Sequence, residues 1–133
     1  MGHTINYYNG ALTVTVEGRV HTQEILQDIR EQLDKLEDRA AVILDMTLCI
    51  GFDQQFKSML HRILQHQHVG VVGFCGVGPS IEADMRDIVV VLGRVRRVVV
   101  KPTEAELLKE FGLAAPTEHK LTGMLAYLKK ENA

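Results

Sequence analysis

The stretch AVILDMT, residues 41–47, decides the fold that the sequence predicts. Four apolar residues in a row, without alternation, are typical of a short strand that is buried on both faces of a sheet. The polar residues Asp45 and Thr47 follow this apolar run, so we expect the strand to end near residue 44. Apolar residues recur at helical spacing in residues 22–37 and 53–67, which predicts a helix on either side of the strand.

The pattern continues outward in both directions. Residues 4–8 and 11–17 are predicted to form a β-hairpin around Asn9-Gly10, a pair that suits a tight type I′ turn. Gly18 is expected to end the second arm, and Thr22 to cap the helix that follows. The other predicted elements are strands at residues 69–74 and 95–100 and helices at residues 81–92, 103–112 and 118–130.

This order predicts a single α/β domain. Strands that alternate with helices form crossover units, so the sheet should be mainly parallel, with the hairpin adding one antiparallel edge strand. We assign residues 1–115 to this domain. Residues 116–133 are predicted to be an additional C-terminal helix that packs on the domain or on a partner.

Composition excludes several classes of protein. The chain has 133 residues, with 15 Lys and Arg against 17 Asp and Glu, and only 5% aromatic residues. The chain has neither the basic excess nor the stacking aromatic residues that are typical of nucleic-acid-binding proteins. No apolar run reaches the roughly 20 residues of a membrane span, and no signal peptide precedes the hairpin. Two cysteines, Cys49 and Cys75, cannot make a disulfide framework, so we expect a cytoplasmic protein.

The charges are unevenly distributed along the chain. Residues 24–38 hold six acidic and two basic side chains, whereas a later basic strip consists of Arg94, Arg96, Arg97 and Lys101. This strip could recognise an anionic ligand or an acidic partner. Alternatively, it is the solvated edge of a strand whose valines are buried.

A glycine-rich segment offers a candidate anion site. Residues 73–80 have the spacing of the phosphate-binding pattern G-x-x-x-x-G-K-[ST], but Pro79 occupies the lysine position. Backbone amides near Gly76, Gly78 and Ser80 could still hold an anion, with Arg96 and Arg97 as partners. The alternative is a tight turn in which Ser80 is the N-cap of the next helix.

The sequence contains no complete catalytic or metal-binding set. Cys75 at a strand end could be a nucleophile, but buried structural cysteines are common. Asp45 and Asp53 could divide acid and base roles, yet no third group completes them. The spacing of the histidines at positions 61, 66 and 68 does not suit a zinc site. We therefore expect a protein without metal, cofactor or catalytic activity.

The element order and the motif VILDMT, residues 42–47, resemble the STAS domain family over roughly residues 12–112. This family includes the anti-anti-sigma factors of bacterial stress and sporulation control. Its corresponding strand ends in Asp-Leu-Ser, and a second Asp follows eight residues after the first, as Asp53 does here. Ser-Ser-Gly comes next in the family, and its first serine is the phosphoacceptor. This chain has Gln54, Gln55 and Phe56 there, and glutamine cannot accept phosphate.

The resemblance implies a bacterial regulatory domain that works by binding another protein or a second copy of itself, without a serine phospho-switch. The expected recognition surface is the loop after the buried strand and the start of the next helix. Its residues are Asp45, Thr47, Asp53, Gln54 and Gln55. The alternative is a sensor of a small anionic or apolar ligand at the glycine-rich loop and the carboxyl ends of the strands.

Overall fold

A five-stranded sheet forms the centre of the molecule, with its strands in the order β1-β2-β3-β4-β5. The computed structural model describes residues 2–8, 10–20 and 24–113. The strands are β1 (Gly2–Tyr8), β2 (Ala11–Val20), β3 (Ala40–Phe52), β4 (Val69–Cys75) and β5 (Arg97–Lys101). β1 pairs antiparallel with β2, and the other neighbours are parallel. The predicted mixed α/β fold is therefore confirmed.

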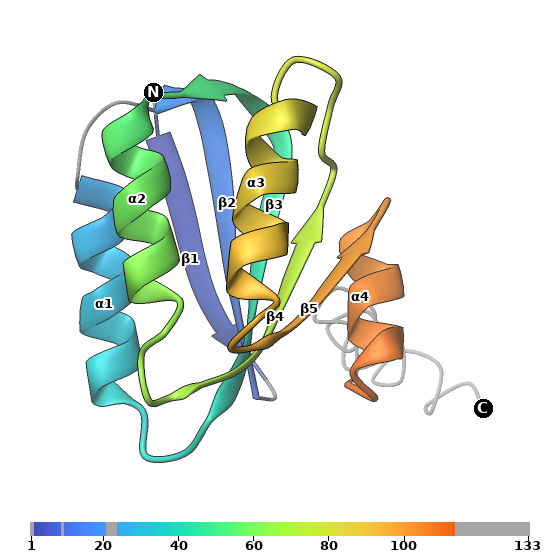
Figure 1. Ribbon diagram of the computed structural model, residues 1–133. Helices are drawn as coiled ribbons and strands as arrows, with labels where there is room; N and C mark the ends of the chain where they lie inside the picture. Colours follow the sequence, from blue (N-terminus) through green and yellow to red (C-terminus); the bar gives the residue numbers. More distant parts are fainter. Residues whose placement is uncertain (1, 9, 21–23, 114–133) are drawn as a thin grey trace, which may run out of the picture.

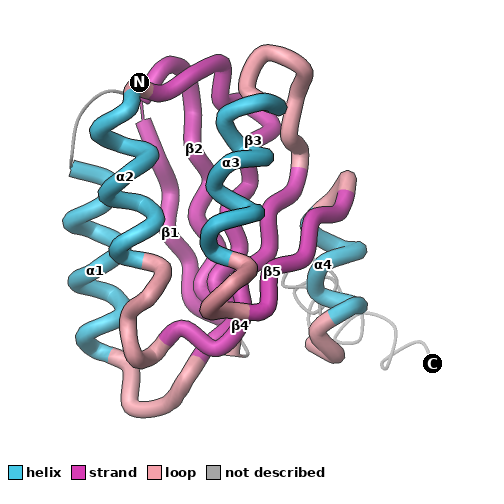
Figure 2. The backbone as a smooth tube through the Cα atoms, viewed as in Figure 1, coloured by secondary structure: helices cyan, strands magenta, loops and turns pink. Residues whose placement is uncertain are grey.

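Three helices cover one face of the sheet, and a short fourth helix lies on the other (Figure 1). The helices are α1 (Glu24–Lys35), α2 (Gln54–Ile63), α3 (Glu82–Leu92) and α4 (Glu104–Glu110). The tube drawing shows the same layers, with the strands running behind α1, α2 and α3 (Figure 2). The predicted helix at residues 118–130, the linker before it and the Thr22 cap lie outside the described residues.

β3 is the strand that both layers share. Val42 and Leu44 are completely buried against the three-helix side, and Ala41 and Ile43 are buried against α4. Alternate residues of a strand point to opposite faces, so a strand covered on both faces needs an unbroken apolar run. That requirement explains the run at residues 41–44.

The α4 side is packed closely enough to require a glycine. A Cβ atom placed on Gly73 of β4 would lie 2.8 Å from Cδ2 of Leu107, which is fully buried in α4. The N-terminus of α4 is held by Thr103, whose side chain accepts a hydrogen bond of 3.2 Å from the Glu106 backbone N–H. This is one half of a capping box.

Two boundaries differ from the prediction in a way that changes the site. β3 does not end near residue 44 but continues to Phe52, and β2 passes Gly18 to Val20. The two extensions pair with each other, from Leu48 beside Glu17 to Phe52 beside Val20, with one register shift before Glu17 and a second between Gly18 and Arg19. The segment that we expected to be a recognition loop is therefore mostly strand.

Other boundaries moved by a few residues. α2 ends at Ile63 and not at residue 67, and β5 starts at Arg97 and not at residue 95. Ser80 is not the N-cap of α3, because Ile81 occupies that position and no side chain caps the helix.

The buried part of β3 can be tested with two leucines of the same strand. Leu44 is completely buried and Leu48 is 54% exposed. We predict that Leu44→Ala lowers the free energy of unfolding in urea by about 3 kcal/mol, because it removes core contacts and leaves a cavity. Leu48→Ala should lower the free energy of unfolding by about 0.5 kcal/mol or less. Equal losses would contradict the assignment of Leu44 to a doubly covered strand.

Candidate functional site

Asp45 lies where β3 loses its second neighbour. It is the last β3 residue to pair with β4, opposite Cys75. One carboxylate oxygen, Oδ1, accepts from the backbone N–H of Thr47 at 3.0 Å and from the Thr47 hydroxyl at 2.6 Å. Such a local bond satisfies the side chain within the strand. The two polar residues therefore do not stop β3.

The next three residues of the predicted recognition surface lie at the start of α2. Asp53 is the N-cap, and its Oδ1 accepts from the Phe56 backbone N–H at 2.8 Å. Gln54 and Gln55 follow in the first turn, and both are exposed. The Phe52 and Phe56 rings, 5.4 Å apart, hold the end of β3 against this helix.

The glycine-rich loop packs directly on β3. Gly76 has φ = +68°, and a Cβ atom there would collide with the Thr47 side chain and lie 2.7 Å from the Thr47 backbone N. Its own N–H donates to the Pro102 carbonyl at 3.2 Å. The structure therefore needs glycine at this position for close packing between the loop and β3.

The two arginines expected to assist this loop lie at the other end of the sheet. Arg97 pairs with Val71 near the beginning of β4, whereas the loop follows Cys75 at its end. Arg96 donates to the backbone carbonyls of Gln65 and His66 at 2.9 and 3.0 Å, and Arg97 donates to Glu110 at 3.0 Å. The structure therefore does not bring Gly76, Gly78 and Ser80 together with Arg96 and Arg97.

A polar cluster that the sequence did not reveal lies under the start of α4. The Thr13 hydroxyl, 7% exposed, donates to Glu104 at 3.3 Å across 91 residues of sequence. Burial raises the pKa of Glu104, and the nearby Asp45 raises it further. No local pattern links Thr13 to Glu104, so only the folded sheet brings them together.

Cys75 belongs to the same cluster and is unsuited to nucleophilic chemistry. Burial, followed by the charges of Asp45 and Glu104, raises the pKa of its thiol to about 12. Cys49 is also buried, and burial raises the pKa of its thiol. Thiolate, and not thiol, is the reactive form of cysteine.

Exposed apolar side chains mark the end of β3. Leu48 and Ile50 are 54% and 64% exposed, whereas their neighbours Cys49 and Phe52 are buried in the core. Within residues 46–52, Leu48, Cys49, Gly51 and Phe52 pair with β2 on one side, and no described strand pairs on the other side. Apolar side chains at predicted loop positions carry no distinct sequence signal, so this surface was missed.

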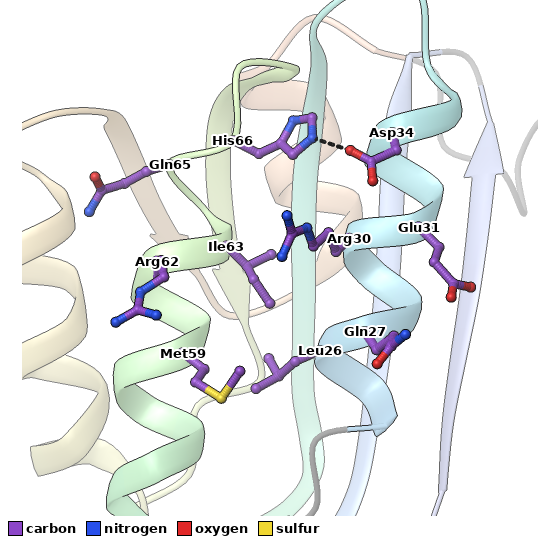
Figure 3. A pocket seen from close by; sticks show the side chains of 10 residues that line it. All are labelled: Leu26, Gln27, Arg30, Glu31, Asp34, Met59, Arg62, Ile63, Gln65 and His66. Atoms are coloured by element: carbon purple, nitrogen blue, oxygen red, sulfur yellow. Dashed lines mark hydrogen bonds and ion pairs between the residues drawn. The ribbon is translucent and has the colours of Figure 1, made fainter.

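Two hollows lie between the helices. The smaller, about 230 Å³, is bordered by Gln54 of α2 and Val91 of α3. Lys57 also borders this hollow. Its Nζ lies 2.9 Å from Oδ2 of Asp87 and 3.7 Å from Oδ1 of Asp84. The larger, about 640 Å³, lies between α1 and α2 (Figure 3).

The sequence comparisons and the structure comparison gave different results. No model of a known protein family matches the chain, and no curated protein matches it. Among solved structures, the anti-sigma factor antagonist SpoIIAA in its unphosphorylated form has a TM-score of 0.56 and 12% identity. That match covers 83% of this chain and 97% of SpoIIAA. The fold is STAS-like.

A second structure supports the same assignment of fold. A sulfate transporter family protein from Wolinella succinogenes has a TM-score of 0.56 and 18% identity, covering 76% of this chain and 88% of that protein. Both identities are low, so these likenesses concern the fold. The STAS-like architecture expected from the element order is confirmed.

Within residues 2–8, 10–20 and 24–113, no helix is long and apolar enough to cross a membrane. The side chains described in these ranges also include no group of three or more metal-binding residues.

The burial of Cys75 predicts a slow thiol. In a Cys49→Ala variant at pH 8, a thiol with a pKa of about 12 is ionised in about one molecule in ten thousand. We expect labelling of Cys75 by 5,5′-dithiobis(2-nitrobenzoate) to be at least 100-fold slower than in the same variant unfolded in urea. Labelling of the folded variant at the unfolded rate would show that Cys75 is accessible and reactive.

Proposed function

We propose that this chain is a non-catalytic regulatory domain that binds a protein partner through the end of β3 and the start of α2. The observation that carries this proposal is the exposure of Leu48 and Ile50 on a strand extension that pairs on one side only. Exposed apolar groups beside unpaired backbone donors and acceptors are features of protein interaction surfaces.

The chemistry of this extension supports binding. Residues 46–52, MTLCIGF, contain no charged side chain and no proline, the residues that commonly protect an open strand edge. Two register shifts twist the strand there, which limits indiscriminate pairing. Thr47, Gln54 and Gln55 add exposed polar groups around the apolar pair. A mixed surface of this kind suits a specific partner.

The likeness to an anti-sigma factor antagonist supports a role in protein-protein regulation. Gln54 and Gln55 have no hydroxyl group, so we infer that serine phosphorylation does not control binding at this turn. The partner is a different protein or a second copy of this chain, in the cytoplasm of a bacterium.

The candidate catalytic groups already have structural roles. Asp53 caps α2, Asp45 bonds to Thr47, and the Cys75 thiol is buried with a raised pKa. These roles support a protein without catalytic activity. The alternative of a sensor of a small anionic or apolar ligand at the glycine-rich loop is less well supported, because Arg96 and Arg97 lie away from that loop.

The proposal is tested by purifying partners from the protein's own host after cross-linking. A Leu48→Asp/Ile50→Asp variant should lose the specific partner at least tenfold, because it places charges on the apolar surface. Val100→Asp is the matched control, since Val100 is 48% exposed on β5, away from this surface. Circular dichroism should show that both variants are folded.

Equal recovery of every partner by the double variant and by Val100→Asp would contradict the proposed surface. Recovery of a second copy of this chain, lost in the double variant, would identify the partner as the protein itself.

A further inference from the structure

We propose that the groove between α1 and α2 binds one molecule of an anionic amphiphile, such as a medium-chain carboxylate. The apolar chain would lie along Met59 and Ile63, and the anionic head would contact Arg30. This site is separate from the proposed partner surface at the end of β3.

The groove has the size and the apolar floor that this ligand requires. Its volume is about 640 Å³, within the roughly 300–1,000 Å³ of small-molecule sites. Met59 and Ile63 are partly buried against the core, and Leu26 lies completely buried beneath them. Figure 3 shows Met59 and Leu26 facing each other across the space between the helices. The apolar surface open to a ligand therefore comes from Met59 and Ile63, with Leu26 buried behind them.

Arg30 supplies a cation at this floor. Its guanidinium extends from α1 toward α2, beside Ile63 (Figure 3). Arg30 is exposed and forms no hydrogen bond or ion pair with another described residue, although its charge acts on Asp34 in the next turn of α1. Arg62 of α2 also borders the hollow, but its guanidinium points away from α1 in Figure 3, so Arg30 is the cation nearer the floor. A guanidinium presents a planar fork of donors that fits a carboxylate or phosphate.

The acidic residues of the groove leave Arg30 available. Glu31 points away from α2 in Figure 3. His66 accepts at Nδ1 from the His68 backbone N–H at 3.0 Å, so its Nε2 carries a proton and donates to Asp34 at 2.7 Å. Asp34 is therefore bound to the histidine. The His66 hydrogen bond and, less strongly, the charge of Arg30 lower the pKa of Asp34, so Asp34 stays ionised while Arg30 forms no ion pair with it.

The lining favours an amphiphile over other anions. A nucleotide base would be expected to stack on an aromatic ring, and no Phe, Tyr or Trp lines the groove. Inorganic phosphate would leave the apolar floor of Met59 and Ile63 exposed to water. A ligand with a hydrocarbon chain and one anionic head uses both features.

The test is a titration of the full chain with decanoate, followed by ¹⁵N NMR and calorimetry. We expect saturable 1:1 binding, with the largest shift changes in α1 and α2. Inorganic phosphate, which lacks the chain, and decyltrimethylammonium, which reverses the charge, should each bind at least tenfold more weakly. Vesicles of anionic phospholipid test whether the ligand comes from a membrane surface instead.

Arg30→Gln should weaken decanoate binding about tenfold, the loss expected for one charge-assisted hydrogen bond. Arg86→Gln is the matched control, because Arg86 is an exposed arginine on α3 whose partner is Glu82. Absence of saturable decanoate binding, equal affinity in the two variants, or binding to vesicles alone would overturn the proposal. Because neither arginine is buried, both variants should retain the wild-type fold.

Discussion

The coverage of β3 on both faces is the constraint on which the rest of the structure depends. Its apolar run packs against three helices on one side and α4 on the other, which fixes both layers relative to the sheet. β3 has a neighbouring strand on each side only as far as Asp45, which pairs with Cys75 at the end of β4. Beyond that point β3 continues with one neighbour and exposes Leu48 and Ile50. The end of β4 therefore separates the buried part of β3 from the part proposed to bind a partner.

The parallel arrangement of the strands also decides which groups can act together. It places the glycine-rich loop beside Thr47 and puts Arg96 and Arg97 at the opposite end of the sheet. It gathers Thr13, Cys75 and Glu104 under α4, where burial keeps the thiol protonated. The partner surface proposed at the end of β3 and the ligand site proposed between α1 and α2 therefore lie on separate parts of the domain.

The sequence predicts the element order well, because apolar runs and helical periodicity follow directly from burial. It misplaces the end of β3, since Asp45 and Thr47 look like turn residues and instead satisfy each other within the strand. It correctly marks the start of the second helix near Asp53, which is the N-cap. The α1–α2 groove and the Thr13–Glu104 contact depend on how distant elements pack, and no local pattern encodes that packing.

Amide hydrogen exchange along β3, followed residue by residue by NMR, tests the central claim most directly. In a parallel strand, successive N–H groups point alternately to the two neighbours. Residues 41–45 should all be protected, because β2 and β4 both pair with them. Register shifts interrupt the pairing of residues 46–52, so the N–H groups of the paired residues Leu48, Cys49, Gly51 and Phe52 should exchange slowly where they point toward β2 and fast where they face the open edge. Uniformly fast exchange there would show a loop, and uniform protection would show a closed edge; either result would contradict the account.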